Sequence, residues 1–147
     1  MDKLIRIAIG SDHAGYELKS QIIYAISGNK AFHFYDFGSY SAEPVDYPII
    51  GHLVAKAVTS DNYDYGIVIC GSGNGITMTV NKYSEIRSAL CWNKQIAKLA
   101  RCHNDANILA LPGRFLKPDE AVEIVIEFLY SEFEGGKHDR RKKMIPS

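Results

Sequence analysis

The sequence has no surplus of charge of either sign, because 17 lysines and arginines balance 17 aspartates and glutamates. A chain without net charge has no global field that would attract nucleic acid or a membrane surface. It also has no apolar run long enough to span a bilayer, and its first apolar run, which ends at Ser11, is too short for a signal peptide. These absences predict a cytoplasmic protein that binds neither nucleic acid nor membrane.

Cysteine is scarce, with three residues in 147 and no pair at CxxC spacing. An odd number without that spacing argues against a disulfide framework and against a zinc site, and favours a reducing compartment. The rest of the composition, 46% hydrophobic and 23% charged, is typical of a globular protein. The length fits a single domain, which we assign to residues 1–147.

Strand and helix patterns alternate along the chain. The clearest strand is 64–70, where consecutive Ile67, Val68 and Ile69 are typical of a parallel strand that is buried on both faces. The predicted strands are 5–10, 31–38, 64–70, 87–92 and 107–113, and the predicted helices are 15–27, 49–57, 76–83, 94–102 and 118–133. This order predicts an α/β fold, a three-layer α/β/α sandwich with a five-stranded parallel sheet. In such sheets ligands bind outside the carboxyl ends of the strands.

A glycine-rich segment, CGSGNG at 70–75, follows the third predicted strand. The alternating Gly71, Gly73 and Gly75 allow consecutive backbone N–H groups to face inward, and the next helix adds its positive end. We therefore favour an anion site over a simple tight turn. The segment lacks the third glycine of a dinucleotide fingerprint. Residues 10–19 have the two glycines of a phosphate-binding loop but no Lys-Ser/Thr directly after the second one. We therefore expect neither a dinucleotide nor a nucleoside triphosphate as ligand.

Cys70 ends the buried third strand and begins that loop. A thiolate is stabilised by inward N–H groups and a helix N-terminus, which predicts a lowered pKa and a role as a base. By position alone, a small core residue is an equally good interpretation. We interpret Cys91, Cys102, His33 and His52 as structural, because none has such surroundings.

Further polar side chains stand next to the predicted strand ends. Asp12 and His13 follow the first strand, whereas His103 and Asn104 precede the fifth. We expect all four at one rim of the sheet with Cys70. The alternatives are a helix N-cap for Asp12 and a helix C-cap for His103.

The chain ends in a basic segment. Residues 137–143 read KHDRRKK and follow the glycine pair Gly135-Gly136, which redirects the chain after the last predicted helix. This run is either a solvated end or a set of cations folded back over a phosphate. We assign 132–147 as a basic tail that completes a phosphate site.

The sequence resembles one known family from end to end. The matching segments are GSDHAGYELK, DFG, VDYP, DYGIVICGSGNGI, NK, IRSALC, ARCHNDANILALPGR and FEGGKHDRR. On these motifs the chain is similar to the ribose-5-phosphate isomerase B family, which also contains galactose-6-phosphate isomerase subunits. The resemblance implies a Rossmann-like fold and a homodimer in which both subunits build each of two active sites, with pairing into tetramers left open.

The implied reaction is the isomerisation of ribose 5-phosphate to ribulose 5-phosphate through a cis-enediolate, in the non-oxidative pentose phosphate pathway, without metal or organic cofactor. The resemblance assigns Cys70 as the base between C1 and C2; some relatives use a glutamate where Ile76 stands here. It assigns ring opening to His103 beside Asp12, and we expect Ser72 to hydrogen-bond the O1/O2 proton. The implied substrate-binding residues are Asp12, His13, Tyr47, Gly71, Ser72, Gly73, Asn74, Gly75, Asn104, Arg114, Lys137 and Arg141.

One departure from the family concerns the tail. Lys137 stands where the family usually has arginine, so the charge is kept but the bidentate contact with a phosphate is lost. Two alternative functions also remain open. One is isomerisation of a six-carbon aldose phosphate, such as allose or galactose 6-phosphate. The other is a sensor that binds a sugar phosphate without converting it.

Overall fold

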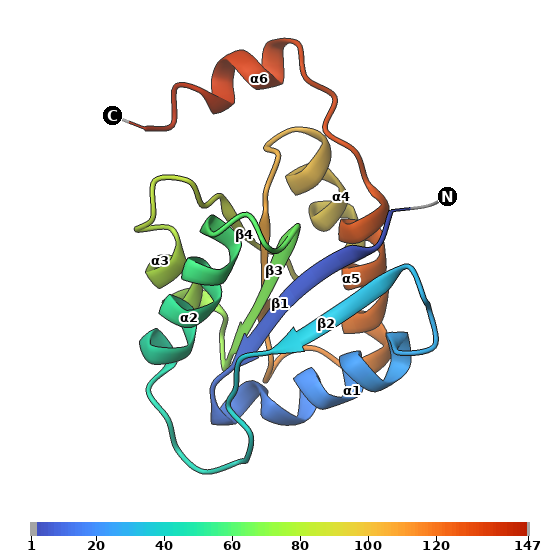
Figure 1. Cartoon of the computed structure of the whole chain (residues 1–147), viewed down its shortest axis with the longest axis vertical. Helices are drawn as coiled ribbons and strands as arrows, with labels where there is room; N and C mark the ends of the chain where they lie inside the picture. The colour runs from blue at the N-terminus through green and yellow to red at the C-terminus, as the bar shows by residue number, and fades with distance from the viewer. Residues whose placement is uncertain (1–2, 147) are drawn as a thin grey trace.

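Five parallel strands form the central sheet of the computed structural model, which describes residues 3–146 (Figure 1). The order of the strands across the sheet is β2-β1-β3-β5-β4. Their bounds are β1 Ile5–Ser11, β2 Phe32–Asp36, β3 Tyr65–Cys70, β4 Ser88–Leu90 and β5 Ile108–Pro112. The prediction of a three-layer α/β fold with five parallel strands is confirmed.

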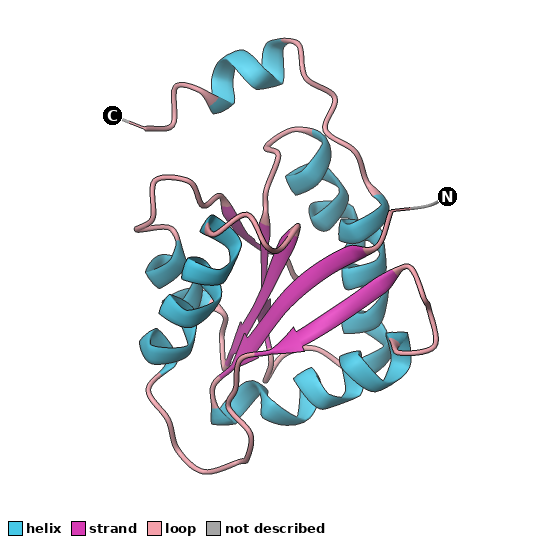
Figure 2. Cartoon of the chain, in the orientation of Figure 1, coloured by secondary structure: helices cyan, strands magenta, loops and turns pink. Residues whose placement is uncertain are grey.

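Helices cover both faces of the sheet (Figure 2). One layer contains α1 (Tyr16–Ile26), α4 (Lys94–Cys102) and α5 (Pro118–Tyr130), and the other contains α2 (Tyr47–Thr59) and α3 (Asn74–Val80). A short 3-10 turn, η1 (His13–Gly15), precedes α1, and a last helix, α6 (Lys137–Lys142), follows α5. Within residues 3–146, no helix combines the length and the apolar character needed to cross a membrane.

The alternation of side chains along the strands divides the core into two parts. Ile67 and Ile69 of β3 pack in the cluster that α1 and α5 complete, whereas Val68 and Cys70 face the cluster formed with α2 and α3. Both clusters are almost fully buried, which explains the continuous apolar run in the sequence of β3. The side chain of Cys70 therefore lies on the face of the sheet that α2 and α3 cover.

The chain leaves neighbouring strands in opposite directions. After β1 it turns into η1 and α1 on one face, and after β3 it turns into α3 on the other face (Figure 1). A crevice forms at the carboxyl ends of strands where successive connections diverge in this way. The loops that carry Asp12 and the glycine segment therefore border the same crevice.

Two helix ends differ from the prediction by three residues, and one helix was not predicted. The third helix ends at Val80 rather than near residue 83, because Asn81 caps it and binds the edge strand through Ser88. The fifth ends at Tyr130 rather than at residue 133, where Ser131 takes an extended conformation. The sixth helix, α6, was not predicted, because it buries none of its residues and so has no apolar periodicity.

Candidate active site

Three loops converge on Cys70 at the carboxyl end of β3. The Asp12 N–H donates to the carbonyl of Ile69 at 3.1 Å, and the Gly113 N–H donates to the carbonyl of Cys70 at 2.8 Å. The side chain of Cys70 is only 4% exposed. The thiol thus lies beneath the loops that follow β1, β3 and β5.

The glycine segment takes a conformation that requires its glycines. Gly73 has φ +78°, and a Cβ there would come within 2.4 Å of Leu90. The Ser72 hydroxyl accepts a hydrogen bond from the Asn74 N–H at 3.2 Å, which sets the turn into α3. Because α3 has only seven residues, the N–H groups of the loop itself are the stronger candidates for binding an anion.

Arg114 and Tyr47 lie against the two ends of this segment. A Cβ at Gly71 would come within 3.3 Å of the Arg114 guanidinium, and one at Gly75 would come within 2.4 Å of the Tyr47 ring. A pocket of about 250 Å³ opens between α2 and α3 and includes Tyr47 and Gly75 in its lining. The fold therefore brings a guanidinium and a phenol to the loop that begins at Cys70.

Asp12 and His13 complete this rim. Asp12 is 6% exposed, and its Oδ1 accepts from the Gly15 N–H at 3.1 Å, so it does act as an N-cap, here of the 3-10 turn η1. His13 Nδ1 accepts from the Val45 N–H at 3.2 Å. An acceptor at Nδ1 means that the proton of the neutral ring is on Nε2, which makes that nitrogen a donor.

The remaining predicted residues lie at the opposite end of the sheet, so the expectation of a single rim within one chain was wrong. His103 and Asn104 follow α4, which returns the chain to the amino end of β5. Lys137 and Arg141 belong to α6, which lies beyond that same end (Figure 1). The five residues of β5 separate the two rims by about 16 Å.

Two histidines and a glutamate cluster at this amino rim. The rings of His103 and His138 stack at 4.1 Å with an angle of 8° between their planes. Glu134 Oε1 lies 3.8 Å from His103 Nε2 and 3.5 Å from His138 Nε2. Desolvation and the nearby His103, Lys137 and Arg141 lower the pKa of His138, and together they outweigh the carboxylate of Glu134.

The same three side chains are the group that could hold a metal ion among residues 3–146, since their ligand atoms lie within 4.8 Å of one another. An ion bound there would occupy one ring nitrogen of His103. An acid–base role for His103 requires the nitrogen that transfers the proton to be free. Metal binding at the ring nitrogen that transfers the proton would therefore prevent the acid–base role of His103.

Sequence reasoning missed His138 and Glu134. Glu134 and His138 are four residues apart, a spacing that can place two side chains close together. The glycine pair Gly135-Gly136 between them argued against a helix there, and the residues after 136 were interpreted only as cations. Two of the residues interpreted as structural have surroundings that agree with this interpretation. His52 Nδ1 lies 2.7 Å from the Tyr83 hydroxyl, and Cys91 is completely buried.

Comparison with known proteins extends these observations. Escherichia coli (strain K12) ribose-5-phosphate isomerase B is 39% identical over 140 residues, which are 95% of this chain and 93% of that protein. The crystal structure of a ribose 5-phosphate isomerase from Thermotoga maritima has a TM-score of 0.93 and 45% identity, and covers 96% of this chain and 97% of that one. Mycoplasma genitalium ribose-5-phosphate isomerase B, whose structure holds ribulose-5-phosphate, has a TM-score of 0.90 and 40% identity, with 97% and 95% coverage.

The family model described as Ribose/Galactose Isomerase matches residues 7–145, which is nearly the whole chain. The fold and the near-complete coverage of relatives above 30% identity agree with that match. This chain therefore belongs to the ribose/galactose isomerase family.

Proposed function

We propose that this protein interconverts ribose 5-phosphate and ribulose 5-phosphate as an aldose–ketose isomerase. The observation that carries the proposal is the convergence of Cys70, Asp12 and the glycine segment at one rim of the sheet. A base, a carboxylate and a row of backbone donors are what a proton shift next to a carbonyl requires. The names of the relatives, and the ribulose-5-phosphate held by the Mycoplasma genitalium protein, support the same substrate.

The complete site needs a second copy of the chain. Cys70 and His103 lie at opposite ends of one sheet, too far apart to act on one five-carbon sugar. In a homodimer, the partner's His103 and α6 would face the Cys70 rim. Exposed apolar side chains beside Tyr47 support a contact surface there, namely Ile49, Leu53 and Met78 on α2 and α3.

Binding of the sugar begins with its phosphate. His13 and Arg114 supply donors from one subunit, and the partner's Lys137 and the partner's Arg141 supply charge from α6. Asp12 uses only Oδ1 for its cap, which leaves Oδ2 to accept a hydrogen bond from the anomeric hydroxyl and so orient it. The partner's His103 then opens the furanose by acid–base transfer.

The proton shift follows in the open-chain sugar. The Cys70 thiolate removes the proton from C2, and the electron pair of that C–H bond moves toward the carbonyl so that O1 becomes the oxyanion of the cis-enediolate. The N–H groups of residues 71–75 and the partner's Asn104 face the developing oxyanion, and each such donor contributes about 10²–10³ in rate in other enzymes. Ser72 hydrogen-bonds the proton that passes from O2 to O1, and the Cys70 thiol then returns its proton to C1 as the carbonyl forms at C2.

Conversion of ribose 5-phosphate by the EDTA-treated protein tests this function. We expect turnover in the wild type and its loss in Cys70→Ala. Near-normal turnover in Cys70→Ser would contradict the assignment of the base. Absence of turnover in the wild type would contradict the reaction itself.

The family model also covers galactose isomerases, so the six-carbon alternative needs a direct comparison. Values of kcat/KM for ribose 5-phosphate and for allose and galactose 6-phosphates, measured side by side, would decide between five and six carbons. A sensor would bind these compounds without turnover. We also propose a cytoplasmic location, which the three free, buried cysteines support through their need for a reducing compartment.

A further inference from the structure

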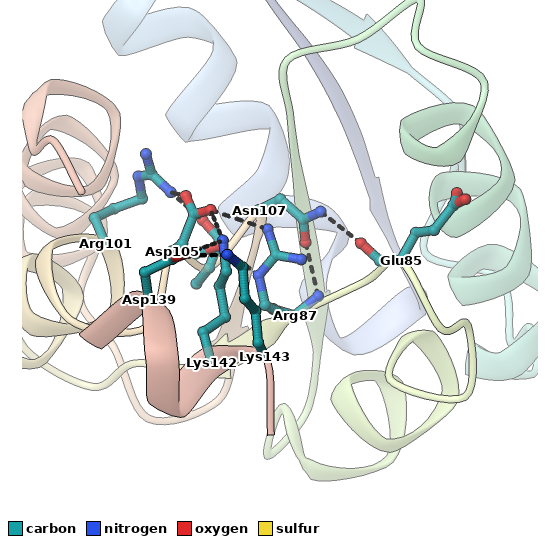
Figure 3. A network of polar contacts seen from close by, with 9 residues as sticks. Glu85, Arg87, Arg101, Asp105, Asn107, Asp139, Lys142 and Lys143 are labelled. Carbon is teal, nitrogen blue, oxygen red and sulfur yellow. Dashed lines mark hydrogen bonds and ion pairs between the residues drawn. The ribbon is translucent and has the colours of Figure 1, made fainter. Parts of the chain in front are cut away.

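The carboxylate of Asp105 joins three segments that are far apart in the sequence (Figure 3). Its Oδ1 lies 2.9 Å from Arg101 Nη1, at the end of α4. Its Oδ2 lies 3.3 Å from Arg87 Nη2, just before β4, and 3.0 Å from Lys142 Nζ on α6. One carboxylate is thus shared by three cations, and the α4–β5 loop, the edge strand and the C-terminal helix meet at it.

Helix α6 has little apolar contact with the body of the protein. None of its six residues is buried, so the hydrophobic effect contributes little to its attachment. The chain before it is held by a hydrogen bond from the Glu134 N–H to the Cys102 carbonyl at 3.0 Å. From α6 itself, His138 stacks on His103, and Lys142 reaches Asp105 while lying 4.8 Å from the Phe133 ring.

Lys142 and Lys143 are neighbours with different surroundings. The side chain of Lys142 is 19% exposed and pairs with Asp105 outside α6 at 3.0 Å as well as with Asp139 inside it at 3.4 Å. The side chain of Lys143, the residue that follows α6, is 72% exposed and pairs with Asp139 of that helix at 2.8 Å. Loss of Lys142 therefore cuts a link between α6 and the body, whereas loss of Lys143 does not.

We propose that Asp105 and Lys142 are positioning residues, whose ion pair fixes α6 against the loop that carries His103. The ring-opening histidine and the phosphate cations Lys137 and Arg141 then form one pre-assembled half of the active site. A pocket of about 330 Å³ lies between the loop and the helix, lined by His103, Asn104, His138, Arg141, Lys142 and Ile145. This inference rests on the proposed function.

The charge state of Asp105 agrees with this role. Burial by itself would raise the pKa of the carboxyl, but hydrogen bonds from Lys142 and Arg101 and the charges of Lys142 and Arg87 outweigh it. The pKa is lowered as a result, so the carboxylate stays ionised at neutral pH and the ion pair with Lys142 persists.

The test compares Lys142→Met with the matched control Lys143→Met. We expect amide hydrogen exchange of residues 138–145 to accelerate about fivefold in Lys142→Met, the effect of losing one partly buried ion pair. The KM for ribose 5-phosphate and the inhibition constant of inorganic phosphate should rise by a similar factor, while kcat falls less. Lys143→Met should match the wild type, and Lys142→Arg should restore most of the phosphate affinity, because a guanidinium can still reach Asp105.

Asp105→Asn is a second variant, but it also leaves Arg87 and Arg101 without their carboxylate and so destabilises the body of the protein. Identical exchange rates in Lys142→Met and Lys143→Met would overturn the proposal. Faster exchange without weaker phosphate binding would overturn it as well, because the link would then hold the helix without positioning the site. If the wild type does not turn over ribose 5-phosphate, the proposed function fails, and hydrogen exchange and phosphate binding still test the link.

Discussion

The three cysteines of this chain lie in different surroundings. Cys70 ends β3 beneath the glycine segment, whereas Cys91 is completely buried in the apolar cluster next to α4 and α5. That burial raises the pKa of the Cys91 thiol to about 12. Only the thiolate is a good nucleophile, so the reactivity of each cysteine reports its surroundings.

Alkylation should therefore distinguish Cys91 from Cys70. In the native protein at pH 8, iodoacetamide should leave Cys91 unmodified, because about one thiol in 10⁴ is ionised at a pH four units below its pKa. Cys70 should be modified before Cys91, and turnover should be lost in proportion to the modification of Cys70. Mass spectrometry of the alkylated peptides measures both sites, and unfolding in urea should make Cys91 reactive. Rapid modification of Cys91 in the folded protein would contradict this.

Lys137 offers a second test at the level of one side chain. A guanidinium can bind two phosphate oxygens at once, whereas an ammonium binds as a point charge. Lys137→Arg should therefore lower the KM for ribose 5-phosphate by about threefold with little change in kcat. Lys143→Arg, which makes the same exchange at the exposed residue after α6, is the control. An unchanged KM in Lys137→Arg would remove this residue from the phosphate site.

At the scale of elements, the contact between α2 and α3 sets the shape of the glycine segment. The Tyr47 ring at the start of α2 occupies the space beside Gly75 where a side chain would otherwise stand. Gly28, between α1 and β2, serves as a comparison, because a Cβ added there would have no neighbouring atom within 4 Å. Comparing substitutions at the two glycines therefore distinguishes the effect of close packing at Gly75 from the general cost of replacing a glycine.

Gly75→Ala should lower kcat/KM by about 10²-fold, because the added methyl displaces either Tyr47 or the loop that carries the backbone donors. Gly28→Ala should leave kcat/KM unchanged. Steady-state kinetics of the two variants, with circular dichroism to verify folding, makes the comparison. Full activity in Gly75→Ala would mean that the loop does not need its present geometry.

The attachment of α6 should also depend on pH. The pKa of Asp105 is lowered from its ordinary value of 3.8 in the folded protein. A group with a lowered folded pKa contributes stability that is complete above its unfolded pKa and is lost as the pH falls through the folded value. Asp105→Asn should therefore cost about 2 kcal/mol of unfolding free energy at pH 7, and this cost should shrink as the pH falls from about 5 to below 3.8, the ordinary pKa of the carboxyl.

Urea unfolding of the wild type and Asp105→Asn across that range measures the difference. Lys143→Met serves as its control, because the exposed pair with Asp139 contributes little at any pH. A cost of Asp105→Asn that does not change with pH would contradict the ionic role of this carboxylate.

At the scale of the whole molecule, the two groups of site residues lie at opposite ends of one sheet. The proposed homodimer brings the Cys70 rim of each subunit to the α6 end of the other. In that arrangement, Cys70→Ala removes the residue that one subunit contributes to a shared site, and His103→Asn removes the residue that the other subunit contributes. A hybrid dimer with one subunit of each kind therefore has one site in which both residues are intact. Each variant alone should be inactive.

Co-expression of the two variants should restore about a quarter of wild-type activity. Random pairing makes half of the dimers hybrid, and each hybrid has one intact site of two. The measurement is kcat per subunit of the co-purified mixture, compared with a mixture prepared without subunit exchange. No recovery in verified hybrids would contradict sites built from both subunits.

Much of the architecture and part of the site could be predicted from the sequence. The continuous apolar run of 64–70 marked a strand buried on both faces, and the alternating glycines after it marked a loop with inward N–H groups. These features are local, because burial and backbone conformation act on consecutive residues. Asp12 at the end of β1 and Cys70 at the end of β3 lie together because all strands are parallel, and that also followed from the strand pattern.

Only the tertiary structure decided on which side of the molecule His103 and the tail lie. One residue directly before a strand and another directly after it are both close to that strand in sequence. In space, however, the two residues are separated by the full length of the strand. Helix α6 was hidden for a related reason, since it has no apolar face. It contacts the body of the protein through Lys142 and Asp105, which lies 37 residues earlier in the chain. Such long-range ion pairs leave no periodic pattern in the sequence, and they arise only when the fold brings their partners together.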